Sequence, residues 1–359
     1  MMVKNESKRI ITSLESVLGT VKSVIIYDTG STDDTLQLID DFCQKNNLEL
    51  HIKKGNFVDF STSRNVSLEF AEQFTHIKYL LLLDGNDELK EGLYLKKISR
   101  KLLNSEQNGF MISQEWKNPD GTLTKYYNIR FIKNNCNWRY KGSVHEYIES
   151  NIGIMGKIDR VVLFQDRKYD ADKSMGRYIK DKEFLLKDYI INPKEPRTLF
   201  YLAQTCSCLN ENEESFRYYK ERTQVEGFYE ERFHSFLRMG ELGEKLGKDW
   251  NELLQYYLEA YNIIERAEPL VKIAEYYRSL KKWNLSFLYC RKACDLDYPK
   301  ECNLFIDRYL YDYYRWHLLG IVSYYANKFE DGKDGCFKAI KARPDIEIDK
   351  SNLKFYIKK

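Results

Sequence analysis

The spacing of apolar residues changes near residue 170, and this change constrains the fold more than any other feature of the sequence. Up to about Arg167, short apolar runs alternate with amphipathic segments, whereas after about Asp170 helix-like segments follow one another without strand-like runs. The two patterns bury their apolar side chains in different ways, so they predict two domains. We place the boundary between residues 169 and 170, which gives domains of residues 1–169 and 170–359.

The first half is predicted to form an open α/β sheet. Its elements are expected in the order strand, helix, strand, helix, strand, at residues 24–27, 32–45, 48–52, 62–73 and 78–83. Later strands at residues 109–115, 123–132 and 160–164 have mixed spacing and are expected to include antiparallel ones. In an open sheet of this kind the ligand binds beyond the carboxyl ends of the strands.

The second half contains three segments that each read as helix, polar turn, helix. They start at residues 196, 232 and 267, and the spacing of about 35 residues is close to the ~34 of a tetratricopeptide repeat. A fourth, degenerate unit is expected over residues 303–342. Because one pair of helices cannot bury its apolar face alone, stacked pairs in a curved array are predicted, with an irregular helical bundle as the alternative.

Composition excludes several classes of protein. With 57 basic and 54 acidic residues the net charge is only +3, so no strong field favours nucleic acid. The eight cysteines are scattered without C-x-x-C pairs, which indicates reduced thiols and a cytoplasmic location. No apolar run approaches the roughly 18 to 20 residues that a membrane span needs.

The segment LLLLDGNDEL, residues 80–89, runs four leucines into a polar cluster of Asp84, Asn86, Asp87 and Glu88. This is where an open sheet presents its ligand site, and a hard divalent cation with phosphate oxygens would stabilise clustered carboxylates there. The alternative for Asp87 and Glu88 is that they begin a helix over residues 89–103, where its dipole favours acids.

The segment YDTGSTDDT, residues 27–35, places Asp28 at the tip of a buried strand. Ser31 and Asp34 have the spacing of a helix capping box, which does not require Asp28. A buried carboxylate needs hydrogen-bond donors, and a base imide or ribose hydroxyl would supply them. The absence of G-x-G-x-x-G from the sequence disfavours a dinucleotide site.

Two further segments carry candidate residues. In FSTSRNVSLEFA, Arg64 is expected near the start of a helix, where a guanidinium can hold a base or phosphate. In NWRYKGSVHEYI, His145 precedes Glu146. A lone histidine is usually packed or on the surface, but its acidic neighbour makes a metal ligand or an acid/base pair a second interpretation.

Five segments in register resemble family 2 glycosyltransferases of the GT-A fold, a Rossmann-like nucleotide-diphospho-sugar transferase fold. They are MMVKNES, IIYDTGSTDDT, SRNVSLEFA, LLLLDGNDEL and RFIKNNCNWRYKGSVHE. The second half is similar to the helical, tetratricopeptide-like region fused behind such domains in bacterial and giant-virus proteins. The resemblance covers nearly the whole chain.

The resemblance implies roles for particular residues at the nucleotide. Asn5 and Glu6 match the loop after the first strand, beside the nucleotide, and Asp28 matches the acid that contacts uracil or ribose. Arg64 matches an arginine near the base and diphosphate, and Asp84 matches the first acid of the D-x-D motif.

The resemblance also implies a cation, Mn²⁺ or Mg²⁺, and a catalytic base. The expected metal ligands are Asp84, Asn86, Asp87 and His145, and the candidates for the base are Glu146, Glu115 and Asp120. Two departures stand out. Asn86 replaces the second acid of the motif and is a weaker ligand, and the chain starts at Met1-Met2-Val3, so that the sheet edge is expected to be incomplete.

The implied activity is transfer of a sugar from a nucleotide donor, most simply a UDP-sugar, to an acceptor hydroxyl with inversion, in the manner of a hexosyltransferase. The acceptor would be a protein or glycan held by the helical array, which could also form a homodimer, and a viral chain would act in the host cytoplasm. The alternative is a catalytically inactive scaffold that only binds. An RNA-binding repeat protein is a third class, which the interspersed charges disfavour.

Overall fold

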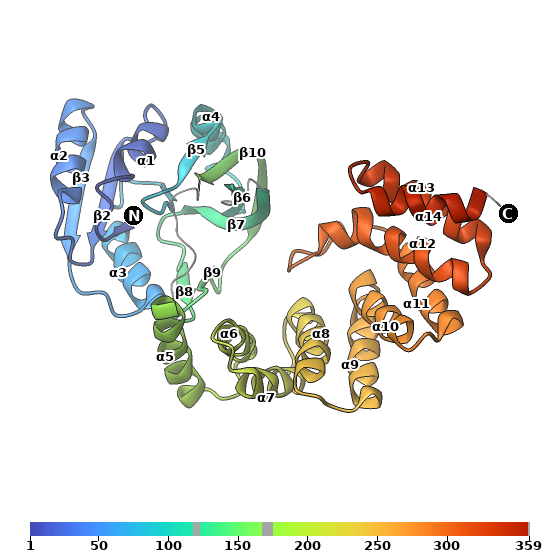
Figure 1. The fold of residues 1–359 in the computed structure, drawn as a ribbon. Coiled ribbons are helices and arrows are strands. Elements are labelled where there is room, and N and C mark those ends of the chain that lie inside the picture. The colour runs from blue at the N-terminus through green and yellow to red at the C-terminus, as the bar shows by residue number, and fades with distance from the viewer. Residues whose placement is uncertain (118–122, 167–174, 358–359) are drawn as a thin grey trace. The chain divides into compact units, whose positions relative to one another are not determined.

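The computed structural model describes residues 1–117, 123–166 and 175–357, and the chain forms two compact units, Met1–Asp188 and Tyr189–Lys359 (Figure 1). The domain boundary predicted at 169/170 lies outside the described residues and stays a prediction. Helix α5 (Met175–Ile191) begins in the first unit, where Phe184 packs edge-on against Phe57 and Asp188 accepts a hydrogen bond from the Ser143 N–H at 3.0 Å. Within the described ranges, no helix is both long and apolar enough to cross a membrane.

The first unit starts with a parallel three-stranded sheet. Its order is β1 (Met2–Val3), β2 (Ser23–Asp28), β3 (Glu49–Lys54), and the strands alternate with α1 (Ile10–Ser16), α2 (Thr35–Lys45) and α3 (Phe60–Glu72). Burial of β-branched and leucine side chains holds the layers together, with Ile10, Leu14, Ile26 and Ile39 at most 1% exposed. The alternation confirms the predicted α/β class.

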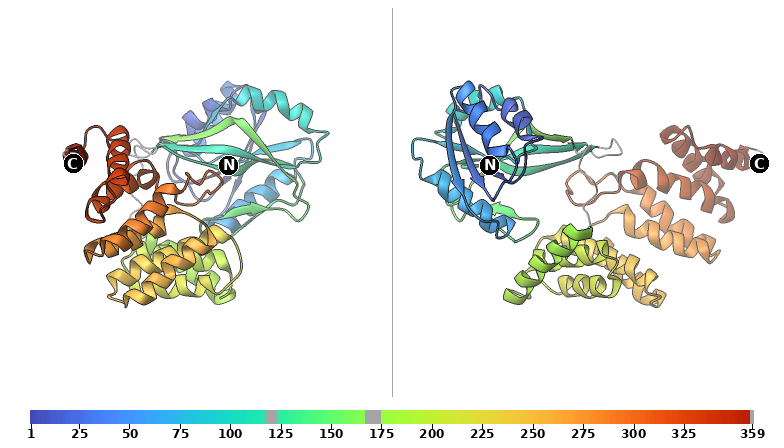
Figure 2. Two further views of the ribbon diagram at one scale, coloured as in Figure 1. Left: turned by 90° about the vertical axis from the view of Figure 1, so that its right-hand side faces the viewer. Right: turned by 60° about the vertical axis from the view of Figure 1, so that its left-hand side comes forward.

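A second sheet of mixed direction carries the site. Its order is β4 (Tyr79–Leu81), β7 (Leu123–Lys133), β6 (Gly109–Lys117), β10 (Met155–Asp166), β5 (Glu88–Lys90). Among the described strands of this second sheet only β6 and β10 pair in parallel, and the other pairs are antiparallel, so the prediction of antiparallel strands is confirmed. The long strands of this sheet run side by side in Figure 2. A cavity of about 500 Å³ with a largely apolar lining lies between β2 and β4.

The helix predicted over residues 89–103 is wrong at its start. Residues Glu88–Lys90 form β5, which pairs with β10, and Leu89 is buried opposite Leu163. Helix α4 (Gly92–Leu102) begins only after Glu91, whose φ of +60° breaks the strand. Three residues are too few for a period of two to be recognised in the sequence.

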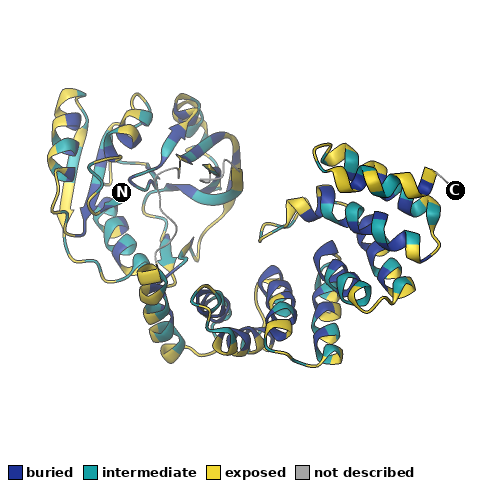
Figure 3. Ribbon diagram, viewed as in Figure 1, coloured by how far each residue is buried: buried dark blue, intermediate teal, exposed yellow. Residues whose placement is uncertain are grey.

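The second unit is made of helices, each packed on the next: α6 (Pro196–Cys208), α7 (Asn212–Thr223), α8 (Tyr229–Lys245), α9 (Trp250–Ile263), α10 (Ala267–Ser279), α11 (Trp283–Asp295), α12 (Arg315–Tyr325), α13 (Phe329–Ala342) and α14 (Glu347–Ile357). Their buried faces are the ones turned toward neighbouring helices (Figure 3).

The helices form tetratricopeptide-like pairs, as predicted. The Ser215 hydroxyl of α7 donates to the Ala203 carbonyl of α6 at 2.8 Å, and two units later Ser286 of α11 makes the same bond to Ala274 of α10. At the α8–α9 crossing only a glycine fits, because a Cβ on Gly240 would lie 2.4 Å from the Tyr257 ring. The fourth helix pair was expected from residue 303. Its first helix, α12, begins only at Arg315, after an irregular connection and the π-helical turn η1 (Leu310–Tyr314).

Candidate functional site

Asp84 lies in the loop that joins β4 to β5, at the edge where the sequence predicted a ligand. The loop approaches the N-terminal segment closely, since a Cβ on Gly85 would lie 2.8 Å from Cγ of Glu6. The Ser13 hydroxyl of α1 donates to the Asp84 carbonyl at 3.4 Å. Two separate segments therefore fix the loop against the rest of the unit.

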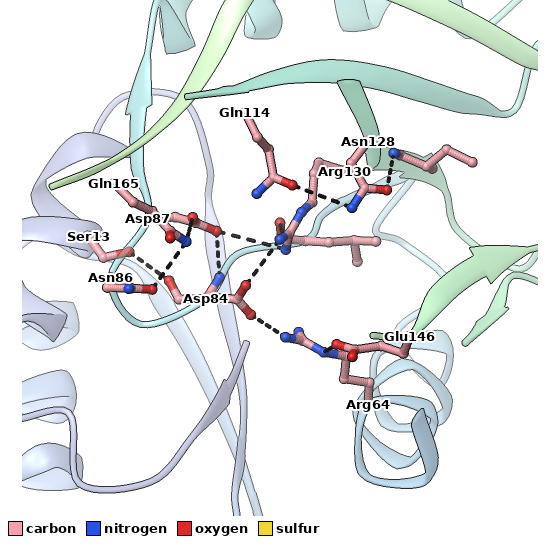
Figure 4. A network of polar contacts seen from close by, with 12 residues as sticks. Ser13, Arg64, Asp84, Asn86, Asp87, Gln114, Asn128, Arg130, Glu146 and Gln165 are labelled. Atoms are coloured by element: carbon pink, nitrogen blue, oxygen red, sulfur yellow. Dashed lines mark hydrogen bonds and ion pairs between the residues drawn. The ribbon is translucent and has the colours of Figure 1, made fainter. Parts of the chain in front are cut away.

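Arg64 joins Asp84 to Glu146. Its Nη2 donates to Asp84 Oδ1 at 2.6 Å and its Nε donates to Glu146 Oε1 at 2.7 Å (Figure 4). The guanidinium lies 5.4 Å from the centre of the Tyr140 ring, so an aromatic face adds to its stabilisation. Arg64 is on the first turns of α3, whose N-cap Asp59 accepts a hydrogen bond from the Thr62 N–H.

Arg130 of β7 binds the other oxygen of the same carboxylate. Its Nη2 donates to Asp84 Oδ2 at 3.1 Å, and its Nη1 lies 3.9 Å from Asp87 Oδ2. Each oxygen of Asp84 thus has its own guanidinium (Figure 4). Arg130 was not predicted as a site residue from the sequence. The signal was an arginine inside the apolar strand segment IRFI, since a charge in a strand interior needs a partner.

Asp87 is fully buried, and both of its carboxylate oxygens accept hydrogen bonds from neighbouring residues. Its Oδ2 accepts from the Asp84 N–H at 2.8 Å, and its Oδ1 accepts from Nε2 of Gln165 on β10 at 2.6 Å. Gln165 also lies 3.4 Å from Oδ1 of Asn86. Gln165 was likewise missed, although a glutamine in the apolar run VVLFQ is the same kind of signal as Arg130.

The two aspartates of the loop titrate in opposite directions. Burial alone would raise the pKa of the Asp84 carboxyl, but the charges of Arg64 and Arg130 outweigh it and hold that pKa below its ordinary value. Burial raises the pKa of the Asp87 carboxyl, because the more distant Arg130 offsets it only in part. The Asp84 carboxyl therefore loses its proton at a lower pH than the Asp87 carboxyl.

Beside this network, two buried N–H groups have no partner among the described residues. The Ile129 N–H donates to Asn128 Oδ1 at 2.8 Å, which turns Asn128 Nδ2 toward Gln114 Oε1, 3.4 Å away. Gln114 Nε2 is thereby left as a buried donor, and Arg130 Nε is the other. Unmet donors next to a carboxylate cluster favour a ligand rich in acceptor oxygens, or ordered water.

The loop between β8 (Arg139–Lys141) and β9 (Tyr147–Glu149) carries two predicted site residues, His145 and Glu146. His145 adopts a φ of +54°, in the left-handed region, and the following residue Glu146 reaches Arg64. Asn65 fixes this hairpin to α3, because its side chain bonds both the N–H and the carbonyl of Tyr140. The structure thus brings Glu146, Arg64 and Asp84 together.

Asn5 and Asp28 hold the loop after β2, and among the described residues neither is hydrogen-bonded to Asp84 or Arg64. The Asp28 carboxylate accepts from the N–H groups of Gly30 and Ser31, and Asn5 Oδ1 accepts from the Thr32 N–H at 2.7 Å. Both predicted nucleotide-binding side chains are thus engaged with the backbone of their own neighbourhood.

The capping box predicted from Ser31 and Asp34 is wrong. Helix α2 begins at Thr35, and Asp34 makes no side-chain capping bond. The carboxylate that binds the first turn is Asp33, which accepts from the Thr35 N–H at 3.1 Å.

Of the remaining candidates for the base, Glu115 of β6 faces away from the network. It forms a cross-strand ion pair with Lys125 at 2.8 Å, and it points to the opposite face of the sheet from its neighbour Gln114. Asp120 lies outside the described residues.

The predicted metal ligands do not form a metal site in this arrangement. Asp84 is bound by two guanidinium groups, Asp87 is turned into the loop, and Asn86 contributes only a neutral oxygen. Among the described residues, no three His, Cys, Asp or Glu side chains are grouped so that they could hold a metal ion. The metal set stays a prediction.

Comparison with known proteins points to one family. Residues 1–163 match the model of "Glycosyl transferase family 2". The glycosyltransferases SunS of Bacillus subtilis (strain 168), described as SPbeta prophage-derived, and of Bacillus phage SPbeta are each 25% identical to this chain over 230 residues. The match covers 61% of this chain and 51% of each relative, so the chain spans about half the length of the curated relatives it matches.

Solved structures with a similar arrangement are tetratricopeptide-repeat and related proteins. The C-terminal part of a TPR repeat-containing protein from Cytophaga hutchinsonii is 16% identical with a TM-score of 0.40, over 51% of this chain and 66% of that one. The pilF protein of Pseudomonas aeruginosa is 10% identical with a TM-score of 0.39, over 52% of this chain and 77% of its own.

Proposed function

We propose that the protein transfers a sugar from a nucleotide diphosphate donor to an acceptor hydroxyl, and the match of residues 1–163 to the model of glycosyl transferase family 2 supports this. A UDP-sugar is the first donor to test. The acceptor is a protein or a glycan, and transfer inverts the anomeric carbon. We propose that the transferred sugar is a hexose.

The observation that supports this proposal best is the sharing of Arg64 between Asp84 and Glu146. Guanidinium groups bind phosphate oxygens with the same fork geometry that they use for carboxylates. A donor diphosphate would therefore compete with the two carboxylates for Arg64, with Arg130 close by. The unmet donors of Gln114 and Arg130 would gain acceptor oxygens in the same place.

Glu146 is the proposed catalytic base. Once the diphosphate draws Arg64 away, the Glu146 carboxylate can take the proton of the acceptor hydroxyl as that oxygen attacks the anomeric carbon. The bond from this carbon to the diphosphate oxygen breaks as the new bond forms, and the nucleotide diphosphate leaves. General base catalysis typically contributes about 10² to 10⁴-fold to the rate. Glu115 and Asp120 stay as alternatives, with Glu115 disfavoured by its pairing to Lys125.

The requirement for Mn²⁺ or Mg²⁺ stays a prediction from the sequence. The ligand set of Asp84, Asn86, Asp87 and His145 would need Asp84 to leave both arginines before it could bind a hard cation. Binding of the acceptor by the helical array, formation of a homodimer and a cytoplasmic location are likewise predictions.

The second candidate function is a binding protein that has lost catalysis. It is favoured by one observation, the neutral Asn86 together with an Asp84 carboxylate whose charge is already compensated by two guanidinium groups. Such a scaffold would bind a nucleotide without turning a nucleotide sugar over.

A screen of nucleotide sugars tests both candidates. Release of the nucleotide diphosphate from one sugar donor, with and without added Mn²⁺, would support the transferase, and the same assay on Glu146→Gln would identify the base. Arg160→Gln is a matched control, because Arg160 pairs with Glu91 on the exposed surface of the same unit. Nucleotide binding without any release of diphosphate would favour the scaffold.

A further inference from the structure

The connection between α11 and η1 stands out among the loops of the helical unit. It covers residues 296–309, whereas the other described connections from α6 to α14 have three to five residues. Long irregular loops in a compact repeat array are uncommon and often functional. This connection folds back onto α6, α8 and the residue before α10, which lie two repeats, one repeat and no repeat before α11.

Glu230 of α8 binds the main chain of this connection. The side chain is fully buried, and its Oε2 accepts from the N–H groups of Asn303 at 2.8 Å and Leu304 at 2.6 Å. One carboxylate thus receives two successive peptide N–H groups. This geometry recognises backbone, whatever the side chains are.

Arg266 and His234 bind the carbonyl groups of the same segment. Arg266 donates from Nη1 to the Leu304 carbonyl at 3.0 Å and from Nη2 to the Phe305 carbonyl at 3.1 Å. His234 Nε2 lies 2.9 Å from the Leu304 carbonyl, so Nε2 carries the proton. Burial, with the neighbouring Arg266 charge, lowers the pKa of His234 to about 3, so the ring is neutral.

Phe305 is the one side chain of the segment that stacks in this region. Its ring lies against Phe200 of α6, with centroids 6.4 Å apart, and against His234 at 5.2 Å. The residue is nonetheless 48% exposed, and its φ of +41° is in the left-handed region that a phenylalanine seldom adopts. The segment is therefore held by main-chain hydrogen bonds, by the Phe305 ring and by Ile306, which packs against the core cluster of α10 to α12, and it carries one strained residue.

We propose that Glu230, His234 and Arg266 form a binding seat for the main chain of an extended polypeptide partner, and that residues 302–306 occupy this seat as an internal substitute. A partner segment binds after the internal one leaves. The seat offers a carboxylate to two adjacent N–H groups and a guanidinium to two adjacent carbonyls, which is the repeat of a peptide backbone. A nucleic acid would bring phosphate toward Glu230. The proposal does not depend on the sugar transfer proposed above.

The direct test uses this chain's own segment as a separate peptide. Residues 302–306 of the full chain are replaced by a Gly-Ser linker of the same length, and a labelled peptide of residues 299–309, PKECNLFIDRY, is titrated by fluorescence anisotropy. The peptide should bind this variant, and binding should weaken at least about tenfold when Glu230→Gln is added. In the intact chain binding should be much weaker, because only the fraction with an open seat can respond.

The matched control is the same peptide carrying N-methyl groups on the amides of Asn303 and Leu304. It keeps every side chain and loses only the two N–H groups that Glu230 accepts. It should not bind. Equal binding of the methylated peptide, or no binding of the unmodified peptide to a linker variant with unchanged circular dichroism, would overturn the proposal.

A second measurement on the intact chain covers the case in which the linker variant does not fold. The amides of Asn303 and Leu304 should exchange with solvent by local opening, faster than the core amides of α8 and α10 and with little dependence on denaturant. If these two amides exchange only when the whole unit unfolds, the segment is a permanent part of the core and the proposal is wrong.

Discussion

The guanidinium of Arg64 lies 2.6 Å from the carboxylate of Asp84, and its other edge is engaged by Glu146. All three side chains are largely buried, at 14%, 24% and 15% exposure. The contact between Arg64 and Asp84 therefore stabilises the fold, and Arg64 is also the proposed binding residue for the donor diphosphate.

Arg64→Gln should destabilise the first unit, because it leaves two carboxylates without their shared cation. Partial exposure limits the loss to about 1–3 kcal/mol, below the value for a fully buried pair. Urea unfolding followed by circular dichroism measures this loss. Adding Asp84→Asn should recover part of it, and a double mutant without any recovery would show that the two side chains are not coupled.

The two aspartates of the β4–β5 loop should give opposite pH dependence of stability. The lowered pKa of Asp84 contributes stability above its unfolded pKa of about 4, and this contribution is lost as the pH falls through the folded value. The raised pKa of Asp87 acts in the other sense, so stability falls as the pH rises from about 4 through its folded pKa.

Urea titrations between pH 3 and pH 7 separate these effects. Relative to the unmodified chain, Asp84→Asn should remove a positive slope of unfolding free energy against pH, and Asp87→Asn should remove a negative one. Slopes that change in the same direction for both variants would contradict the opposite pKa shifts of the two carboxyls.

His234 predicts an acid-sensitive helical unit. Its folded pKa is about 3, below the unfolded value of about 6.5, so its contribution to stability is present above pH 6.5 and is lost as the pH falls toward 3. Between pH 8 and pH 5 the loss should be about 2 kcal/mol. His234→Gln keeps an N–H donor without a titrating ring, so the pH dependence of its unfolding should be flatter by that amount. An unchanged pH profile would mean that the ring is not held neutral.

Glu146→Gln should separate binding from turnover. The amide keeps the shape of the side chain but cannot accept the proton, so turnover should fall by about 10² to 10⁴-fold. Nucleotide affinity should not fall and should rise, because the neutral amide competes less with the diphosphate for Arg64. Steady-state kinetics on the donor found by the screen, with Arg160→Gln as the control, tests this. Normal turnover of Glu146→Gln would remove Glu146 as the base.

Sequence reasoning identified the two halves of the chain because each rests on a periodic pattern repeated over many residues. The helix pairs and the strand–helix alternation follow from apolar spacing alone, and Arg64, Asp84 and Glu146 stood in segments that were singled out. Their mutual contacts could not be predicted, since α3, the β4–β5 loop and the β8–β9 loop meet only through tertiary packing.

Other site residues were not predicted from the sequence, because their roles become visible only when residues distant in the sequence lie next to them. Arg130 and Gln165 look like isolated polar residues in apolar strands until Asp84 and Asp87 are placed next to them. Glu230 and Arg266 look like ordinary helix-end charges, and only the return of residues 303–305 shows that they bind main chain. Local pattern carries no information on such pairings across 38 to 78 positions.

The central claim is that Arg64 and Arg130 hold the diphosphate of the donor, and calorimetric titration of UDP in the presence of EDTA tests it most directly. UDP should bind the unmodified chain and Arg160→Gln alike, and should lose at least about tenfold in affinity, about 1.4 kcal/mol, in Arg64→Gln and in Arg130→Gln. No binding of UDP without Mn²⁺, or equal affinity in the arginine variants, would contradict the account.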